Sequence, residues 1–257
     1  SGGGAGGIST ASNIRKLDEE IEITVFTRDK YVSYSPCAIP YVISNTIPSF
    51  EDIVMRSPED YAEKNIEINL ETEVTAVDKD KKEITYVKDG KENKMKYDKL
   101  VLATGGSPFV PPMKGVDLEG VFKIRTLDDG KEVKEYAKNC KSALVTGAGL
   151  IGIEIAYAFK EMGLEVTLCE MLPQIVPRSL DPDMSRIIEG YLESEGIHLM
   201  LGQPITELKG EDGKVKTAVF DDGTEVDAEM IILSTGVRAE LTLANMIGCE
   251  TGRWGYN

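Results

Sequence analysis

The stretch that decides the fold is Ala143-Leu144-Val145-Thr146-Gly147-Ala148-Gly149-Leu150-Ile151-Gly152, in which an apolar strand runs into a glycine-rich turn. A helical pattern follows to about Met162. The first glycine of such a G-x-G-x-x-G turn permits the tight bend, the second lets the backbone approach a pyrophosphate, and the third lets helix pack on strand. Free N–H groups at the helix N-terminus favour phosphate. The stretch predicts a dinucleotide site at Gly147, Gly149, Ile151 and Gly152.

A carboxylate follows the next predicted strand, which covers residues 165–169. Glu170 lies 18 residues after Gly152. An acid at this place accepts hydrogen bonds from ribose hydroxyls and repels a 2′-phosphate, so Glu170 predicts a preference for NADH over NADPH. Arg178 lies nearby in the sequence, which keeps NADPH as an alternative. A glycine-rich turn that binds no ligand is the other alternative.

The same order of features opens the chain. Gly2, Gly4 and Gly7 repeat the spacing, and a helical stretch over residues 8–17 and an apolar strand over residues 21–26 follow. These features predict a second dinucleotide site, made by the three glycines and the two residues that end the strand, Thr27 and Arg28. An acid is expected at Thr27, and Asp29 is the alternative that could reach back. The strand that should lead into this turn is absent from the given sequence, so we expect the chain to be incomplete at both ends.

Both halves then continue alike. Each has a predicted β-meander with Asp-Gly turns and a final buried strand that ends in Thr-Gly. The segments are 73–78, Asp89-Gly90 and 97–105 in the first half, and 205–208, Asp212-Gly213, Asp222-Gly223 and 229–236 in the second. The repeat predicts an α/β fold with two Rossmann-like dinucleotide-binding domains (FAD/NAD(P)-binding type), each with a β-meander. Two unrelated α/β domains are the alternative.

Composition narrows the class of protein. The chain has 257 residues and a net charge of −15, which disfavours nucleic acid and anionic membranes as partners. No apolar run approaches the ~20 residues of a membrane span, and no signal segment is recognised. The four cysteines form no C-x-x-C pair, which indicates a reducing, cytoplasmic setting without a metal site or disulfide framework. The single histidine, His198, makes histidine-based triads improbable.

One cysteine lies in a distinctive segment, Ser33-Tyr34-Ser35-Pro36-Cys37-Ala38-Ile39-Pro40-Tyr41. Ser35 suits an N-cap and Pro36 a first helical position, which places Cys37 at a helix N-terminus. The helix dipole there favours thiolate and lowers the pKa of a thiol. Pro40 would limit or kink such a helix. The alternative is a small, buried, inert cysteine.

Together these motifs resemble the pyridine nucleotide-disulfide oxidoreductases. The markers are Gly2 to Gly7, Cys37, Ala103-Thr104-Gly105, Gly147 to Gly152 with Ile153-Glu154, and Ser234-Thr235-Gly236-Val237-Arg238. The segment around Cys37 resembles the single-cysteine branch, which contains coenzyme A-disulfide reductases, persulfide or sulfur reductases, and NADH oxidases and peroxidases. The resemblance implies an FAD domain over residues 1–112 and 236–257, with an NAD domain over 113–235 inserted in it.

The resemblance also implies roles for single residues. Thr104 and Gly105 would line the flavin, Gly236 would lie at the cofactors, Val74 would meet the adenine through its backbone, and Glu154 would lie where nicotinamide meets flavin. Full-length members of the family carry a C-terminal dimerisation domain, which implies a homodimer.

The implied reaction runs from NADH through FAD to a disulfide, persulfide or sulfur substrate at Cys37. Oxidases and peroxidases usually carry a histidine where this chain has Ala5, which favours the reductive branch. Arg15 and Lys16 match a basic helix end that helps hold coenzyme A, although Asn13 replaces a further arginine; a solvated helix C-terminus is the alternative. The rival functions are an NADH oxidase or peroxidase that uses a sulfenic acid at Cys37, a flavin reductase of a protein partner, and a non-catalytic NAD-binding module.

Overall fold

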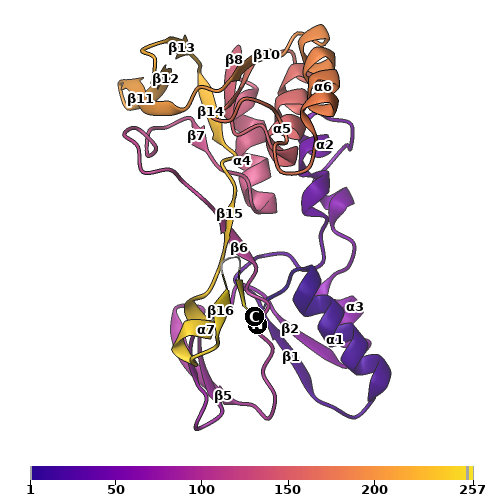
Figure 1. Cartoon of the computed structure of the whole chain (residues 1–257). Helices are drawn as coiled ribbons and strands as arrows, with labels where there is room; N and C mark the ends of the chain where they lie inside the picture. Colours follow the sequence, from indigo (N-terminus) through magenta and orange to yellow (C-terminus); the bar gives the residue numbers. More distant parts are fainter. Residues whose placement is uncertain (1, 253–254, 257) are drawn as a thin grey trace. The chain divides into compact units, whose positions relative to one another are not determined.

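The computed structural model describes residues 2–252 and 255–256. The chain forms two compact units, and the colours of Figure 1 follow the sequence through them. Unit 1 comprises Ser1–Ser35, Glu51–Ser107 and Arg238–Asn257, and unit 2 comprises Pro36–Phe50 and Pro108–Val237. Two of the segments that pass between them contain β6 (Gly106–Pro108) and β15 (Val237–Ala239), which pair in a two-stranded sheet.

Unit 1 is built around a parallel pair of strands and an antiparallel meander. Its elements are α1 (Ala5–Leu17), β1 (Ile23–Phe26), η2 (Glu51–Ile53), α3 (Pro58–Ala62), β2 (Ile66–Asn69), β3 (Glu73–Asp78), β4 (Glu83–Lys88), β5 (Lys91–Lys96), α7 (Thr242–Met246), β16 (Thr251–Gly252) and β17 (Gly255–Tyr256). β1 and β2 run parallel with Ile23 opposite Ile66. Ile8 and Ala11 of α1 pack with Val25 and Tyr61 in the core beside them.

The meander of unit 1 follows the predicted pattern. β3, β4 and β5 form an antiparallel sheet, and the β4–β5 turn has Asp89 and Gly90 at φ values of 52° and 71°. Two consecutive positive φ values define the turn type that Asp-Gly sequences favour between paired strands. Phe26 of β1 meets Tyr86 of β4 with ring centroids 4.9 Å apart, so the meander shares a core with the parallel pair.

One predicted strand of unit 1 is wrong. Residues 97–105 form no strand, whereas the equivalent segment of unit 2 forms β14 (Met230–Leu233). β14 is hydrogen-bonded on one side to β8 (Ser142–Thr146), the strand that leads into the second glycine turn. In unit 1, no strand of the described residues pairs with residues 97–105, and β1 pairs only with β2. An apolar segment becomes a strand only when a neighbour supplies hydrogen-bond partners.

Unit 2 is a five-stranded parallel sheet with helices and a second meander. Its elements are η1 (Pro36–Ala38), α2 (Ile39–Ile43), β7 (Val121–Phe122), α4 (Leu127–Ala137), β8, α5 (Leu150–Glu161), β9 (Glu165–Glu170), α6 (Pro182–Ser194), β10 (His198–Leu201), β11 (Ile205–Glu211), β12 (Lys214–Phe220), β13 (Glu225–Asp227) and β14. The strand order is β10-β9-β8-β14-β7, and all four pairings are parallel. This arrangement confirms the predicted α/β class.

The central strands of unit 2 read as apolar runs because both faces of the sheet are covered. Leu144, Val145 and Ile231 are fully buried, as expected for a parallel sheet with helices packed on it. α5 packs on β8 and β9, and α6 packs on β10. The carboxyl ends of β8 and β9 lead into the second glycine turn and Glu170, which is the edge where ligands bind in such sheets.

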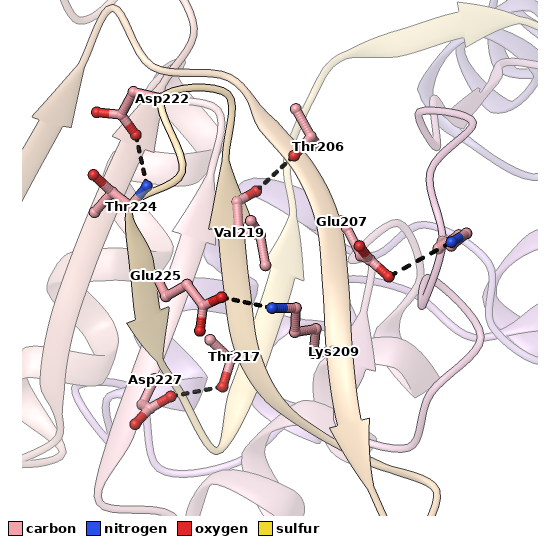
Figure 2. A network of polar contacts seen from close by, with 10 residues as sticks. Thr206, Glu207, Lys209, Thr217, Val219, Asp222, Thr224, Glu225 and Asp227 are labelled. Carbon is pink, nitrogen blue, oxygen red and sulfur yellow. Dashed lines mark hydrogen bonds and ion pairs between the residues drawn. The ribbon is translucent and has the colours of Figure 1, made fainter.

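The meander of unit 2 carries polar contacts across its strands, as Figure 2 shows. Lys209 of β11 pairs with Glu225 of β13 at 2.5 Å, and the Thr217 hydroxyl donates to Asp227 at 2.6 Å. The β11–β12 turn contains Asp212 and Gly213 at positive φ, as the Asp-Gly dipeptide predicts. The exposed ion pair between Lys209 and Glu225 contributes little to stability, so the apolar inner face of the meander is the main source of its stability.

The segment Pro36–Phe50 belongs to unit 2, although the expected boundaries place it in the first domain. The other borders fall at residues 107 and 238, against the expected 112 and 236. α2 explains the difference, because Ile39, Val42 and Ile43 are fully buried and α2 contacts α4 and α5. The assignment of one cofactor to each unit stays a prediction.

Candidate dinucleotide sites and the cysteine segment

The second glycine turn has a backbone that only glycine fits at two of its three positions. Gly147 has a φ of 98°, and a Cβ there would lie 2.2 Å from the Ser234 carbonyl oxygen. A Cβ on Gly152 would lie 1.9 Å from the Gly147 carbonyl oxygen. A Cβ on Gly149, in contrast, would meet no protein atom within 4 Å. The open side of Gly149, at the N-cap of α5, therefore leaves room for a pyrophosphate.

Glu170 lies beside this turn, as the sequence predicts. The backbone N–H of Ala148 donates to Glu170 Oε2 at 2.9 Å, and the N–H of Leu172 donates to Oε1 at 3.0 Å. These bonds hold the carboxylate at the end of β9, next to the glycine turn. Each oxygen keeps a further lone pair, with which it can accept from a ribose hydroxyl. The residues present fit a bound NADH.

The other predicted residues of unit 2 lie on α5 or shortly after the end of β14. Ile151 is exposed at the start of α5. Glu154, one turn later, is partly buried, and desolvation raises the pKa of its carboxyl. Gly236 is exposed with a φ of 113°, and its carbonyl oxygen accepts from the N–H of Phe109 at 2.8 Å. The sites of Ile151 and Glu154 are compatible with a dinucleotide that crosses the N-terminus of α5.

The first glycine turn repeats the second almost atom for atom. A Cβ on Gly2 would lie 2.0 Å from the Ala103 carbonyl oxygen, and one on Gly7 would lie 1.9 Å from the Gly2 carbonyl oxygen. Gly4 is the N-cap of α1 and has open space where a Cβ would stand. The Gly2 N–H donates to Phe26, as the Gly147 N–H donates to Cys169, both at 2.8 Å. The turn fits a second pyrophosphate.

The surroundings of the first turn differ from those of the second. Thr27 is buried, and a Cβ on Gly3 would lie 2.8 Å from the Thr27 Cβ, so the threonine fills the space next to the turn. Arg28 is exposed, and its charge adds to the hydrogen bonds from Thr242 that lower the pKa of Glu240. The structure therefore places Thr27 against the first glycine turn. The charge of Arg28 acts on the carboxyl of Glu240.

The remaining predicted residues of unit 1 lie on two segments. Val74 is buried in β3, next to a break in the β3–β4 register. The Thr104 hydroxyl donates to the Glu240 carbonyl oxygen at 2.8 Å, and the Gly105 carbonyl oxygen accepts from the Glu240 N–H at 3.0 Å. The chain after Gly105 is thereby fixed by its return segment. The cofactor roles of Val74, Thr104 and Gly105 stay predictions.

Cys37 lies in a short turn rather than at the start of a long helix. η1 has three residues and α2 has five, and they meet at Ala38 and Ile39. Pro40 stands in the first turn of α2, where proline is tolerated, so it does not kink a helix that began at Pro36. The macrodipole of so short a helix is small, which removes much of the basis for the expected dipole effect.

The four cysteines are free thiols with different surroundings. Cys37 and Cys249 are exposed. Burial raises the pKa of the Cys140 thiol to about 11 and that of the Cys169 thiol to about 12, so both are neutral at physiological pH. The exposure of Cys37 contradicts the alternative of a buried, inert cysteine. Within residues 2–252 and 255–256, no group of acidic, histidine and cysteine side chains could hold a metal ion.

Arg15 has a structural role that the sequence pattern did not suggest. Its guanidinium donates to the carbonyl oxygens of Asp18 at 3.0 Å, Glu19 at 2.6 Å and Asn65 at 2.7 Å, and also to that of Ile21. The alternative of a solvated side chain is wrong for Arg15, because these bonds tie the end of α1 to the loop after it and to the residue before β2. Lys16 is exposed.

Sequence reasoning missed the residues that complete the turns from a distance. Ser234 and Ala103 supply the carbonyl oxygens that exclude side chains at Gly147 and Gly2. Both belong to the Thr-Gly segments quoted above, so the repeat contained the signal. Lys134 of α4, whose ammonium contacts α2, had no local signal.

Comparisons with known proteins agree with this geometry. The curated relatives include an "NADH oxidase" of Methanocaldococcus jannaschii, which is 51% identical over 98% of this chain and 57% of its own length. An "NAD(P)H sulfur oxidoreductase (CoA-dependent)" of Pyrococcus abyssi is 36% identical over 99% of this chain and 56% of its own length. The chain thus spans little more than half the length of these relatives.

A solved structure shares the fold. The "NAD-Dependent Persulfide Reductase from A. fulgidus" matches with a TM-score of 0.94 and 32% identity, over 98% of this chain and 48% of that one. The family described as pyridine nucleotide-disulphide oxidoreductase matches residues 2–257. This match confirms the predicted fold class and the pairing of FAD with NAD(H) as the family's cofactors. The chain belongs to the pyridine nucleotide-disulphide oxidoreductase family.

Proposed function

We propose that this chain is the dinucleotide-binding part of an FAD-dependent, NADH-linked oxidoreductase that reduces a disulfide, persulfide or sulfur substrate through Cys37. The observation that carries the proposal is the pair of matching glycine turns, of which the second has the carboxylate of Glu170 hydrogen-bonded beside it. Unit 1 binds FAD and unit 2 binds NADH. When bound, the two cofactors supply hydride transfer and electron relay to sulfur.

Unit 2 selects its nucleotide by charge. Gly149 gives the pyrophosphate access to the N-terminus of α5, and Glu170 accepts from the ribose hydroxyls. A 2′-phosphate would meet the negative carboxylate, so NADH is preferred to NADPH. Glu154 retains its proton to higher pH than an exposed glutamate, because partial burial disfavours its charged form.

Cys37 is the group that reacts with sulfur. Its thiolate attacks one sulfur of the substrate disulfide or persulfide; the S–S bond breaks, a mixed disulfide or persulfide forms at Cys37, and the other sulfur leaves as a thiol or sulfide. The bound cofactors would supply the two electrons that, with a proton, break the S–S bond at Cys37. The products are the Cys37 thiolate and the second reduced sulfur as a thiol or sulfide. Exposure in a short turn gives a substrate sulfur access to this thiol.

The names of two relatives support a sulfur substrate. Two of the similar proteins carry names that specify a sulfur oxidoreductase and a persulfide reductase. The name of the Pyrococcus abyssi protein also specifies coenzyme A, so coenzyme A derivatives are the first substrates to test. No helix in the described part of the chain is long and apolar enough to span a bilayer. The full-length protein is proposed to be a cytoplasmic homodimer.

The test is Cys37→Ser in the full-length protein, with the other exposed cysteine, Cys249→Ser, as the matched control. Cys37→Ser should abolish NADH-dependent disulfide or polysulfide reduction and leave reduction of the flavin by NADH intact. Cys249→Ser should keep both activities. Unimpaired sulfur reduction in Cys37→Ser would overturn the proposal.

The second candidate is an NADH oxidase, which the name of the 51% identical relative favours. In that case Cys37 would cycle through a sulfenic acid with oxygen or peroxide as the oxidant. Oxygen consumption by the full-length protein without activity on any sulfur substrate would select this candidate. Normal turnover after Cys37 alkylation would instead favour a flavin reductase of a protein partner, and a colourless purified protein would favour a non-catalytic NAD-binding module.

A further inference from the structure

The segment that carries Cys37 cannot hold its own shape. α2 has five residues, and isolated helices of this length are unstable in water. The structure of residues 36–50 therefore depends on what it packs against. Ile39, Val42 and Ile43 are fully buried in unit 2, where α2 contacts α4 and α5. Cys37 lies in the turn directly before α2, so the helix fixes the chain on one side of the thiol. On the other side, the Ser35 N–H donates to the Ile53 carbonyl oxygen at 3.0 Å.

Lys134 of α4 makes a polar contact between this segment and the rest of unit 2. Its ammonium donates to the Val42 carbonyl oxygen at 2.6 Å. The Val42 oxygen also accepts from the Asn45 N–H at 3.2 Å. It lies near the end of α2, where cations bind favourably. Burial lowers the pKa of Lys134, and the charge of Lys138 adds to this effect. The side chain thus gives up part of its hydration to reach α2.

The ring of Phe50 completes the contact at the other end of the segment. The ammonium groups of Lys131 and Lys134 each lie 5.9 Å from its centroid, a geometry typical of cation–π attraction. Phe50 packs against α4 at Gly130, where a Cβ would lie 2.9 Å from the Phe50 ring and 2.7 Å from Ile39 Cγ2. Gly130 therefore permits the close approach of both ends of the segment to α4.

We propose that Lys134 is a positioning residue for Cys37, because its contacts with Val42 and Phe50 hold residues 36–50, the segment that contains the reactive thiol, on α4. The proposal rests on the proposed function of Cys37. In sulfur exchange, misplacement of a reacting atom by an ångström slows the reaction strongly.

Lys134→Met in the full-length protein tests the proposal, because it keeps the length of the side chain and removes the charge and the donor. Hydrogen exchange of the backbone amides in residues 39–47 should accelerate by at least about tenfold, which is the loss expected for one hydrogen bond to a charged group. Exchange in residues 142–161 should not change. The kcat for sulfur reduction should fall, while the rate of flavin reduction by NADH and the KM for NADH stay the same.

Three further variants make the result specific. Lys134→Arg keeps the charge, the donor and the contact with the ring, and should restore most of the protection and the kcat. Lys138→Met, on the exposed side of the same helix, should behave as the unchanged protein. Gly130→Ala should accelerate exchange in residues 39–47 without altering Lys134, because the new Cβ displaces Ile39 and Phe50.

The outcomes separate this inference from the proposed function. Unchanged exchange and kcat in Lys134→Met, with an inactive Cys37→Ser, would overturn the positioning role and leave the function standing. Faster exchange confined to residues 39–47, with a fully active Cys37→Ser, would overturn the function while confirming the contact. Loss of protection across residues 142–161 as well would also overturn the positioning role, because Lys134 would then stabilise the whole unit.

Discussion

The two glycine turns share a backbone and differ in what stands next to it. In both, the first glycine lies against the carbonyl oxygen of a distant segment, and the second is open. In unit 2, Ala148 fills the space behind the turn and its N–H binds Glu170. In unit 1, Gly3 leaves that space to the buried side chain of Thr27. We propose that the glycines make the phosphate site in both units, and that Glu170 sets the nucleotide preference of the second.

The helices that follow the turns end in a matched way. Arg15 and Lys160 each lie eight residues after the third glycine of their turn. Arg15 binds the Asn65 carbonyl oxygen just before β2, and Lys160 pairs with Glu195 at 2.6 Å shortly before β10. Both therefore tie a helix end to the start of the neighbouring parallel strand. This likeness gives Arg15 a structural role that does not depend on a ligand.

The largest effect is expected where the two turns are the same. Gly147→Ala and Gly2→Ala each place a Cβ within 2.2 Å of a carbonyl oxygen at a positive φ, and should each destabilise the protein by about 3 kcal/mol or more. Gly163→Ala shares the positive φ and has open space, so it should cost only about 1 kcal/mol. Denaturant unfolding measures all three, and equal losses would show that the carbonyl contact is unimportant.

The next effect concerns the helix ends. Arg15→Met removes several hydrogen bonds from a charged donor and should reduce the free energy of unfolding by roughly 2 kcal/mol. Lys16→Met, one residue along and exposed, should leave it unchanged. Thermal unfolding and coenzyme A binding should be measured on both variants. Weaker coenzyme A binding with unaltered stability in Arg15→Met would contradict the structural role.

Substitution of the second glycine of each turn, Gly149 or Gly4, should affect only the nucleotide site that contains it. Gly149→Ala should weaken NADH binding by about tenfold or more and leave the FAD content unchanged, because its Cβ points only into the space proposed for pyrophosphate. Gly4→Ala should do the reverse. Titration with NADH and the flavin absorbance per chain measure the pair. If either variant impaired both cofactors equally, one cofactor could not be assigned to each turn.

The smallest effect concerns the residues that differ. Glu170→Gln keeps an oxygen for one backbone N–H but loses the charge, and should reduce the preference for NADH over NADPH by about fivefold. Thr27→Val keeps the shape that fills the space at Gly3 and should leave FAD retention unchanged. The ratio of kcat/KM for the two nucleotides measures the first change. An unaltered ratio would mean that Glu170 does not contact the ribose.

Sequence patterns were sufficient where a few neighbouring residues decide the geometry. The glycine turns, the Asp-Gly hairpins and β3 lie where their local sequences predict them. The patterns failed where distant contacts decide. Residues 97–105 have the composition of a strand, but no described strand pairs with them. The start of α2 can be predicted from its sequence, but its contact with α4, which lies far away in the sequence, cannot. The docking by Lys134 could not be predicted, because a lone lysine on a helix is usually solvated.

The membership of residues 36–50 in unit 2 also constrains how the protein is made. The chain passes between the units four times, and the contact of Lys134 with Val42 joins residues 92 positions apart. At ordinary rates of translation, the ribosome synthesises α4 roughly 5–20 seconds after α2. During that interval Ile39 and Ile43 are exposed on a nascent chain that has no partner for them. Chaperones that bind short apolar segments would find a target there, next to Cys37, the thiol to which we assign the reaction with sulfur.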